Sequence, residues 1–182
     1  EMKLEDVSVE HDDFKSVILR IAQSTCVVST DTEAAPTYES IVLDLQKVKT
    51  ALETLTGDSS LSCKISLEDP TGYVVYRNAV SPAGASLHEV ALFASAELRM
   101  MKLVKFFESR FTSASLRERQ DNKVRYEVGS DGTRISNIFA KIEENKVELR
   151  CADYGVSQTS LEQVFNMHAA EAEKLKYGGD DH

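Results

Sequence analysis

The spacing of apolar residues changes near Gly57, and this change constrains the fold more than any other feature of the sequence. Upstream, apolar residues recur every three or four positions, as on a helix that buries one face: Tyr38, Ile41, Leu45, Val48, Leu52 and Leu55. Gly57 suits the position just beyond a helix end. Between Leu61 and Leu67 apolar and polar residues alternate instead, which is the period of a half-buried strand. The chain must therefore combine helices and strands, and we expect the α+β class.

The first part of the chain is predicted to be helical. Residues 14–22 carry apolar side chains at helical spacing behind the acidic pair Asp12-Asp13, which suits a helix N-terminus. With the seam that ends before Gly57, this predicts a helical hairpin within residues 1–57. The seam covers fewer than three heptads, so we favour packing within the chain. A partner helix on the same seam, as in an adaptor, is the alternative.

Residues 58–176 are predicted to form one domain with an antiparallel sheet. A β-hairpin is expected at 61–67 and 73–76 around the turn 69–72, and a capping box of Ser86 and Glu89 begins a helical pattern that reaches about Phe111, as one helix or two. A second hairpin at 115–119 and 124–128 follows, then a helix from about Ile135 and a strand at 147–151. This order is that of a ferredoxin-like, split βαβ sheet with helices on one face. A C-terminal helix and a polar tail, 177–182, complete the chain.

Composition excludes several classes of function. The net charge of −9 repels phosphate backbones, so nucleic acid is not an expected partner. No apolar run approaches the ~20 residues that span a bilayer, and the first residues lack the apolar core of a signal peptide. We therefore expect a cytoplasmic chain or the cytosolic part of a membrane protein, without direct membrane insertion.

Residues that would support catalysis, a cofactor or a metal are scarce. The four histidines lie in separate segments without zinc-ligand spacing, and no glycine-rich phosphate motif is present. Cys26, Cys63 and Cys151 lie far apart, which favours reduced core residues, with reactive thiols as the alternative. We expect no enzyme, no cofactor and no metal site.

Four basic residues lie on the second hairpin: Arg117, Arg119, Lys123 and Arg125. Strand alternation predicts that they share the face opposite Val124 and Tyr126. This face is either a solvated strand surface or a small positive patch that contacts an acidic protein surface.

Residues 153–165 read Asp-Tyr-Gly-Val-Ser-Gln-Thr-Ser-Leu-Glu-Gln-Val-Phe. The pattern predicts the end of a strand, a polar loop and a helix that Thr159 caps, with Glu162 completing a capping box. The sequence of this segment resembles the one that closes the C-terminal cytosolic regulatory domain of A-subfamily ABC transporters, the lipid exporters. The likeness extends upstream through Leu103–Phe111, Arg125-Tyr126 and Ile138-Phe139, and covers roughly residues 100–170.

The resemblance implies a non-catalytic domain that braces and regulates the paired ATPase domains by protein contact. It makes the 153–165 segment the candidate contact region, with the residues Asp153, Tyr154, Val156, Ser157, Gln158, Thr159 and Glu162. The chain departs from the family because it carries no Walker A motif and residues 1–60 match nothing in that family. It is thus either an excised fragment or a domain reused on its own.

Two other functions stay open from the sequence. The segment Leu67–Gly72 is similar to the segment after each finger of paired-zinc-finger proteins that chaperone elongation factor, without the finger cysteines, which would suggest a chaperone-like binding module. A ferredoxin-like domain that senses a small molecule would instead need a pocket lined by convergent polar groups.

Overall fold

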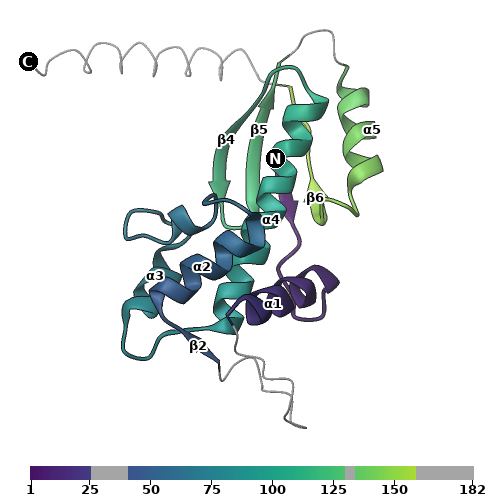
Figure 1. Cartoon of the computed structure of the whole chain (residues 1–182). Helices are drawn as coiled ribbons and strands as arrows, with labels where there is room; N and C mark the ends of the chain where they lie inside the picture. Colours follow the sequence, from purple (N-terminus) through teal and green to yellow (C-terminus); the bar gives the residue numbers. More distant parts are fainter. Residues whose placement is uncertain (26–40, 130–133, 159–182) are drawn as a thin grey trace, which may run out of the picture.

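The computed structural model describes residues 1–25, 41–129 and 134–158 (Figure 1). These residues form the helices α1 (Asp12–Ser24), α2 (Leu45–Thr56), α3 (Tyr73–Val80), α4 (Leu87–Arg110) and α5 (Ile135–Asn145), and a 3-10 turn, η2 (Ser62–Lys64). The strands are β1 (Met2–Leu4), β2 (Val42–Leu43), β3 (Ala85–Ser86), β4 (Ala114–Gln120), β5 (Lys123–Val128) and β6 (Cys151–Tyr154).

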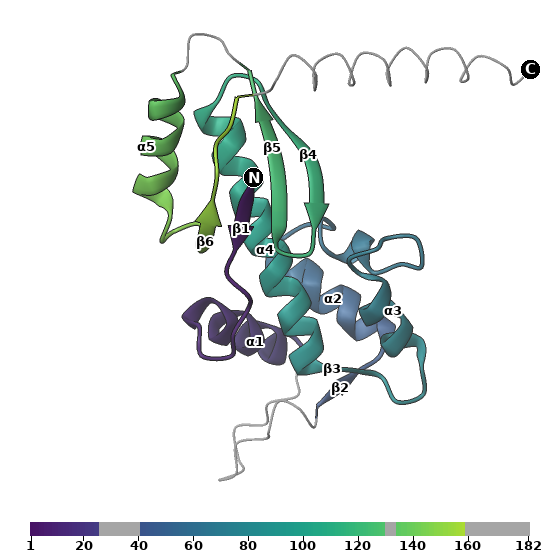
Figure 2. The same ribbon diagram turned by 180° about the vertical axis from the view of Figure 1, so that it is seen from behind.

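A four-stranded sheet has the order β4-β5-β1-β6, and each neighbouring pair is antiparallel. Figure 2 shows β1 between β5 and β6. The α+β class and the antiparallel sheet are thereby confirmed. Along the chain β1, α4, β4, β5, α5 and β6 follow the order strand, helix, strand, strand, helix, strand. The ferredoxin-like assignment itself stays a prediction.

The strand predicted at 61–67 is wrong, and the first strand of the sheet is instead β1. Residues 62–64 form η2, in which the amide of Ile65 donates to the Ser62 carbonyl over 3.1 Å. Leu61 and Ile65 are both buried while Leu67 is 63% exposed, so the inward positions are four residues apart, as on a helix, rather than two. The turn at 69–72 is present, but α3 follows it in place of the second strand.

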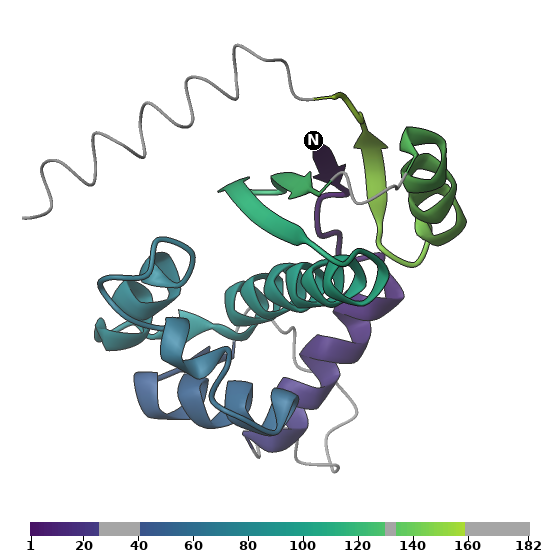
Figure 3. The same ribbon diagram turned by 90° about the horizontal axis from the view of Figure 1, so that it is seen from above.

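The long helical pattern after Ser86 forms one helix, α4. Ser86 caps it, because its hydroxyl oxygen accepts a hydrogen bond from the Glu89 amide over 3.1 Å. The Glu89 carboxylate binds the Asn78 side chain instead of completing the predicted capping box. Figure 3 shows α4 between the helical group of α1, α2 and α3 and the sheet.

Two hydrophobic cores lie along α4. The first takes residues from Phe14 to Ala94, and the second takes residues of β1, β5, β6 and α5 together with the end of α4 from Met100 onward. The seam residues Val48, Leu52 and Leu55 are buried in the first core, so this part of the seam packs within the chain. The helix begins only at Leu45, because Val42–Leu43 forms β2, and Tyr38 lies outside the described residues. Gly57 takes a φ of 81° beyond α2, as its place after the helix predicted. The division of the chain at residues 57 and 176 stays a prediction.

Candidate functional site

The stretch of α4 between the two cores carries a buried carboxylate, Glu97. Its side chain is 2% exposed and accepts hydrogen bonds from Lys64 Nζ, at 2.5 Å from Oε2, and from Arg119 NH1, at 3.1 Å. Arg119 NH2 contacts the other oxygen. Lys64 belongs to η2 beside the helical group and Arg119 to β4 of the sheet, so Glu97 joins the two parts of the molecule through charge.

Opposing effects set the protonation of Glu97. Burial raises the pKa of this carboxyl, but the hydrogen bonds and positive charges of Arg119 and Lys64 outweigh burial. Its pKa therefore lies below the ordinary value of 4.5. Glu97 is ionised at neutral pH and keeps both cations in place.

A second buried ionic cluster surrounds Arg99, two residues along α4. Arg99 Nε donates to Asp13 Oδ2 over 2.7 Å, and NH1 donates to the backbone carbonyls of Glu5 and Asp6 over 3.0 and 3.3 Å. Arg99 NH2 lies 2.9 Å from His11 Nδ1. Arg99 therefore fixes the segment between β1 and α1 against α4.

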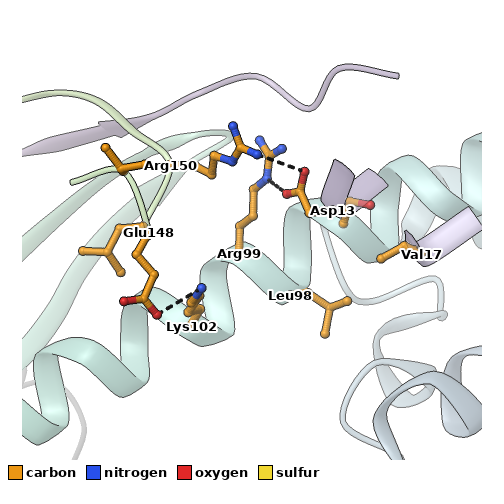
Figure 4. A pocket seen from close by; sticks show the side chains of 10 residues that line it. Asp13, Val17, Leu98, Arg99, Lys102, Glu148 and Arg150 are labelled. Carbon is orange, nitrogen blue, oxygen red and sulfur yellow. Dashed lines mark hydrogen bonds and ion pairs between the residues drawn. The ribbon is translucent and has the colours of Figure 1, made fainter. Parts of the chain in front are cut away.

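A cavity of about 400 Å³ opens beside this cluster. Among its lining residues are Asp13, Arg99, Lys102 and Arg150, together with residues 147–149 of the turn before β6. Figure 4 shows the guanidinium groups of Arg99 and Arg150 side by side next to Asp13, and Lys102 directed at Glu148. Lys102 Nζ is 3.2 Å from Glu148, and Arg150 NH2 is 3.9 Å from Asp13. The charged groups of the cavity thus pair with one another.

The four hairpin cations do not share one face, which corrects the predicted patch. A bulge between Leu116 and Glu118 adds a residue to β4, so Arg119 lies opposite Val124 and points toward α4 and Glu97. The other cations lie away from Glu97. Arg117 Nε donates to Glu127 over 2.5 Å, Arg125 NH2 is 3.4 Å from Glu118, and Lys123 is exposed.

Within the predicted contact segment, the described residues are those up to Gln158. The Tyr154 hydroxyl donates to Glu143 Oε2 of α5 over 2.6 Å, and its ring lies 5.6 Å from the Phe139 ring. The hydrogen bond with Glu143 raises the pKa of Tyr154 to about 12, so the phenol keeps its proton. Tyr154 therefore ties β6 to α5.

The remainder of the segment forms an exposed margin. Asp153, Ser157 and Gln158 are exposed, and Val156 is partly buried against the second core. β6 is the last strand of the sheet, with β1 on one side. Thr159 and Glu162, with the predicted C-terminal helix, lie outside the described residues.

The cysteines divide between core and surface. Cys151 is buried in β6, where burial raises the pKa of its thiol. Cys63 is exposed in η2, which corrects its predicted core position. Cys26 lies outside the described residues. Those residues gather no group of His, Cys, Asp or Glu side chains that would hold a metal ion.

Sequence reasoning missed Glu97, Lys64 and Arg99. The sequence does hold a signal for Glu97. Val90, Ala94 and Glu97 succeed one another at steps of four and then three residues, which places Glu97 on the buried stripe of α4. A charged residue on such a stripe indicates a buried ion pair. Nothing in the sequence pointed to Lys64 as its partner.

Within the described chain, no helix is long and apolar enough to cross a bilayer.

Comparison with known proteins gives partial matches. Residues 89–158 match a family model described as "ABCA1-like, C-terminal R1 regulatory domain". ATP-binding cassette sub-family A member 2 of Homo sapiens is 40% identical over 63 residues, which are 35% of this chain and 3% of that protein. Glucosylceramide transporter ABCA12 of Mus musculus is 33% identical over 69 residues, which are 38% of this chain and 3% of that protein. No solved structure matches the chain significantly.

The chain spans about 3% of the length of the curated relatives that it matches. In the structure the matched residues include all but the first two residues of α4, all of β4, β5, α5 and β6, and the exposed margin after β6. Strand β1 and the helices α1, α2 and α3 lie outside the match.

Proposed function

We propose that the chain regulates an A-subfamily ABC transporter by protein contact with its ATPase domains, because residues 89–158 match the C-terminal regulatory domain of such transporters. The observation that carries the proposal is the family match, which ends in the margin after β6. In this proposal the domain acts on the cytoplasmic side and has no catalysis of its own. The transport of glucosylceramide, which the name of one relative states, makes a lipid the proposed cargo of the transporter.

The proposed contact surface is the margin of β6 with residues 155–158. Asp153, Ser157 and Gln158 present exposed polar groups there, while Tyr154 and its bond to Glu143 hold the strand against α5. An edge strand also offers backbone groups to which a partner can bind. This supports a rigid surface that a neighbouring domain recognises.

The test uses the purified chain and the purified nucleotide-binding domains of human sub-family A member 2. We expect the chain to bind these domains and to change their rate of ATP hydrolysis. The variant Asp153→Arg should weaken binding about tenfold or more, because it reverses a charge within the surface.

The matched control is Glu68→Arg, which makes the same change of charge at an exposed residue outside the family match. Its binding should equal that of the wild type. Failure of the wild-type chain to bind or to change the ATPase rate would overturn the proposal. An equal loss of binding in both variants would contradict the assignment of the contact surface to the margin of β6.

A second candidate function rests on the cavity beside Arg99. Its volume of about 400 Å³ falls in the range of small-molecule sites, and the hydroxyl of Ser95, which lines it, has no hydrogen-bond partner among the described residues. A sensing domain would bind a small charged metabolite there. The test is a thermal-shift screen of amino acids and carboxylic acids. A compound that raised the melting temperature of the wild type, but not that of Ser95→Ala, would favour this function.

A further inference from the structure

A groove of about 760 Å³ runs between α4 and the edge strand β4. We propose that this α4–β4 groove is a docking site for an acidic amphipathic helix of a partner protein. The proposal goes beyond the regulatory function above, because it assigns a surface on the opposite edge of the sheet from β6 and does not require the partner to be an ATPase domain.

The dimensions of the groove suit a helix. One wall is a stripe of α4 whose residues recur every three or four positions: Glu97, Met101, Lys105 and Glu108. At a rise of about 1.5 Å per residue this stripe is about 16 Å long, or three helical turns. The opposite wall is formed by Leu116 and Arg119 of β4, with Lys64 beside Glu97.

The groove exposes apolar side chains on the inner side of the sheet. Leu116 lies directly opposite Tyr126, and Tyr126 stacks on Phe107 of α4 with the ring centroids 3.9 Å apart. Residues opposite each other on antiparallel strands share a face, so Leu116 points to the side that α4 covers. Leu116 is nevertheless 42% exposed, and Met101 across the groove is 40% exposed.

A docked helix would bury both side chains. Methionine is a common lining residue of grooves that receive helices, because its flexible thioether adapts to the partner. The apolar face of an amphipathic helix, with residues at positions i, i+3, i+4 and i+7, presents a stripe of the same length.

Charge selects an acidic partner. Four cations line the groove, Lys64, Lys102, Lys105 and Arg119, against two carboxylates, Glu97 and Glu108. Lys102 also pairs with Glu148, which lies outside the groove, so the lining keeps a surplus of one positive charge on a chain whose net charge is −9. Glu97 binds Lys64 and Arg119 and holds both side chains at the groove. These two side chains therefore lose less conformational entropy when a partner binds. Acidic residues that flank the apolar stripe of a helix would complement this rim.

The test measures binding of a fluorescent peptide to the purified 182-residue chain by anisotropy. The probe is an amphipathic peptide of about 18 residues, or five helical turns, with leucines at i, i+3, i+4 and i+7 and glutamates at most other positions. We expect saturable binding with a dissociation constant in the micromolar range that weakens as salt increases. Met101→Glu and Lys105→Glu should each weaken it about tenfold or more.

Matched controls lie at exposed positions outside the groove. Val74→Glu repeats the apolar-to-acidic change on α3, where Val74 is 59% exposed, and Lys123→Glu repeats the charge reversal on β5. Both should bind the probe as the wild type does. A scrambled peptide of the same composition should bind at least about tenfold more weakly, since its leucines form no stripe.

Four outcomes would overturn the proposal. They are absence of saturable binding, equal binding of the scrambled peptide, equal loss in groove and control variants, and evidence for another occupant. A dimer in light scattering that Met101→Glu dissociates would assign the groove to a second copy of the chain. Binding to phosphatidylserine vesicles that Lys105→Glu abolishes, without peptide binding, would assign it to an anionic membrane surface.

Discussion

Glu97 shows how a single residue couples the two cores of this chain. A carboxylate that is 2% exposed loses its hydration on folding, and only fixed partners can replace the water. Lys64 and Arg119 do so from two different parts of the fold. Removing the carboxylate would therefore affect both parts at once.

Replacing Glu97 with glutamine is predicted to lower the free energy of unfolding by about 2 to 3 kcal/mol. Glutamine keeps the volume but leaves two cations without a counter-charge. The cost stays below that of a fully buried pair, because the Lys64 and Arg119 side chains are 30% and 21% exposed and can turn toward water. Urea denaturation measures the change. Glu108→Gln on the exposed side of α4 is the control and should stay within about 0.5 kcal/mol; an equal loss there would contradict the prediction.

Stability should also fall at acidic pH through the same carboxyl. The pKa of Glu97 is lowered from 4.5 in the folded state, so its contribution is complete above that unfolded value and is lost as pH falls through the lower folded pKa. The difference in unfolding free energy between wild type and Glu97→Gln should be constant from neutral pH down to the unfolded pKa of 4.5 and shrink as the pH falls further, through the lower folded pKa. Urea titrations at these pH values measure it. A difference that persists unchanged at the lowest pH would show that Glu97 does not act through its charge.

At the scale of elements, helices with a full apolar stripe were predictable and short irregular segments were not. The α1 pattern and the β4–β5 hairpin allow one interpretation, because several turns or a complete alternation agree, and the α4 pattern left open only whether it forms one helix or two. Residues 61–67 allow two readings, since Leu61 and Ile65 lie four apart and fit a helical turn as well as a strand. A bulge in β4 places Arg119 on the face of the sheet that α4 covers instead of the predicted opposite face. No residue of β4 indicates that bulge in the sequence.

The turn before α3 places η2, and through it Lys64, against α4. Asp69 Oδ1 accepts hydrogen bonds from the amides of Thr71 and Gly72 over 2.8 and 3.1 Å. This brings Gly72 so close to η2 that a Cβ there would lie 1.9 Å from the carbonyl oxygen of Lys64. A backbone atom cannot move aside as a flexible side chain can.

Gly72→Ala is therefore predicted to destabilise the chain by about 2 to 3 kcal/mol, because the turn and η2 must separate. Thermal unfolding followed by circular dichroism measures the loss. Gly155→Ala is the matched control, since a Cβ at Gly155 meets nothing within 4 Å. A wild-type melting temperature for Gly72→Ala would mean that η2 does not pack on this turn.

At the scale of the whole molecule, the segment that matches the regulatory family does not contain a complete sheet. β5 and β6 both pair with β1 and not with each other, and β1 lies at the other end of the chain from β6. The sequence showed no strand at residues 2–4, because three residues are too few to establish an alternation. The family motifs located the site region, while the central strand that supports it could be found only in the structure.

Deletion of residues 1–6 should consequently unfold the sheet while leaving part of the helical group. Met2 and Leu4 are 3% and 5% exposed in the second core, and the Leu4 amide donates to the Asn122 carbonyl over 2.8 Å. Without β1, the inner edges of β5 and β6 lose their hydrogen-bond partners and the core between them is open to water. Hydrogen exchange should show amides of β5 and β6 exchanging as in an unfolded chain, while amides of α2 keep protection. Lys3→Ala, at the exposed position of the same strand, should leave every protected amide unchanged, and retained protection of β6 in the deletion variant would contradict the assignment of β1 as the central strand.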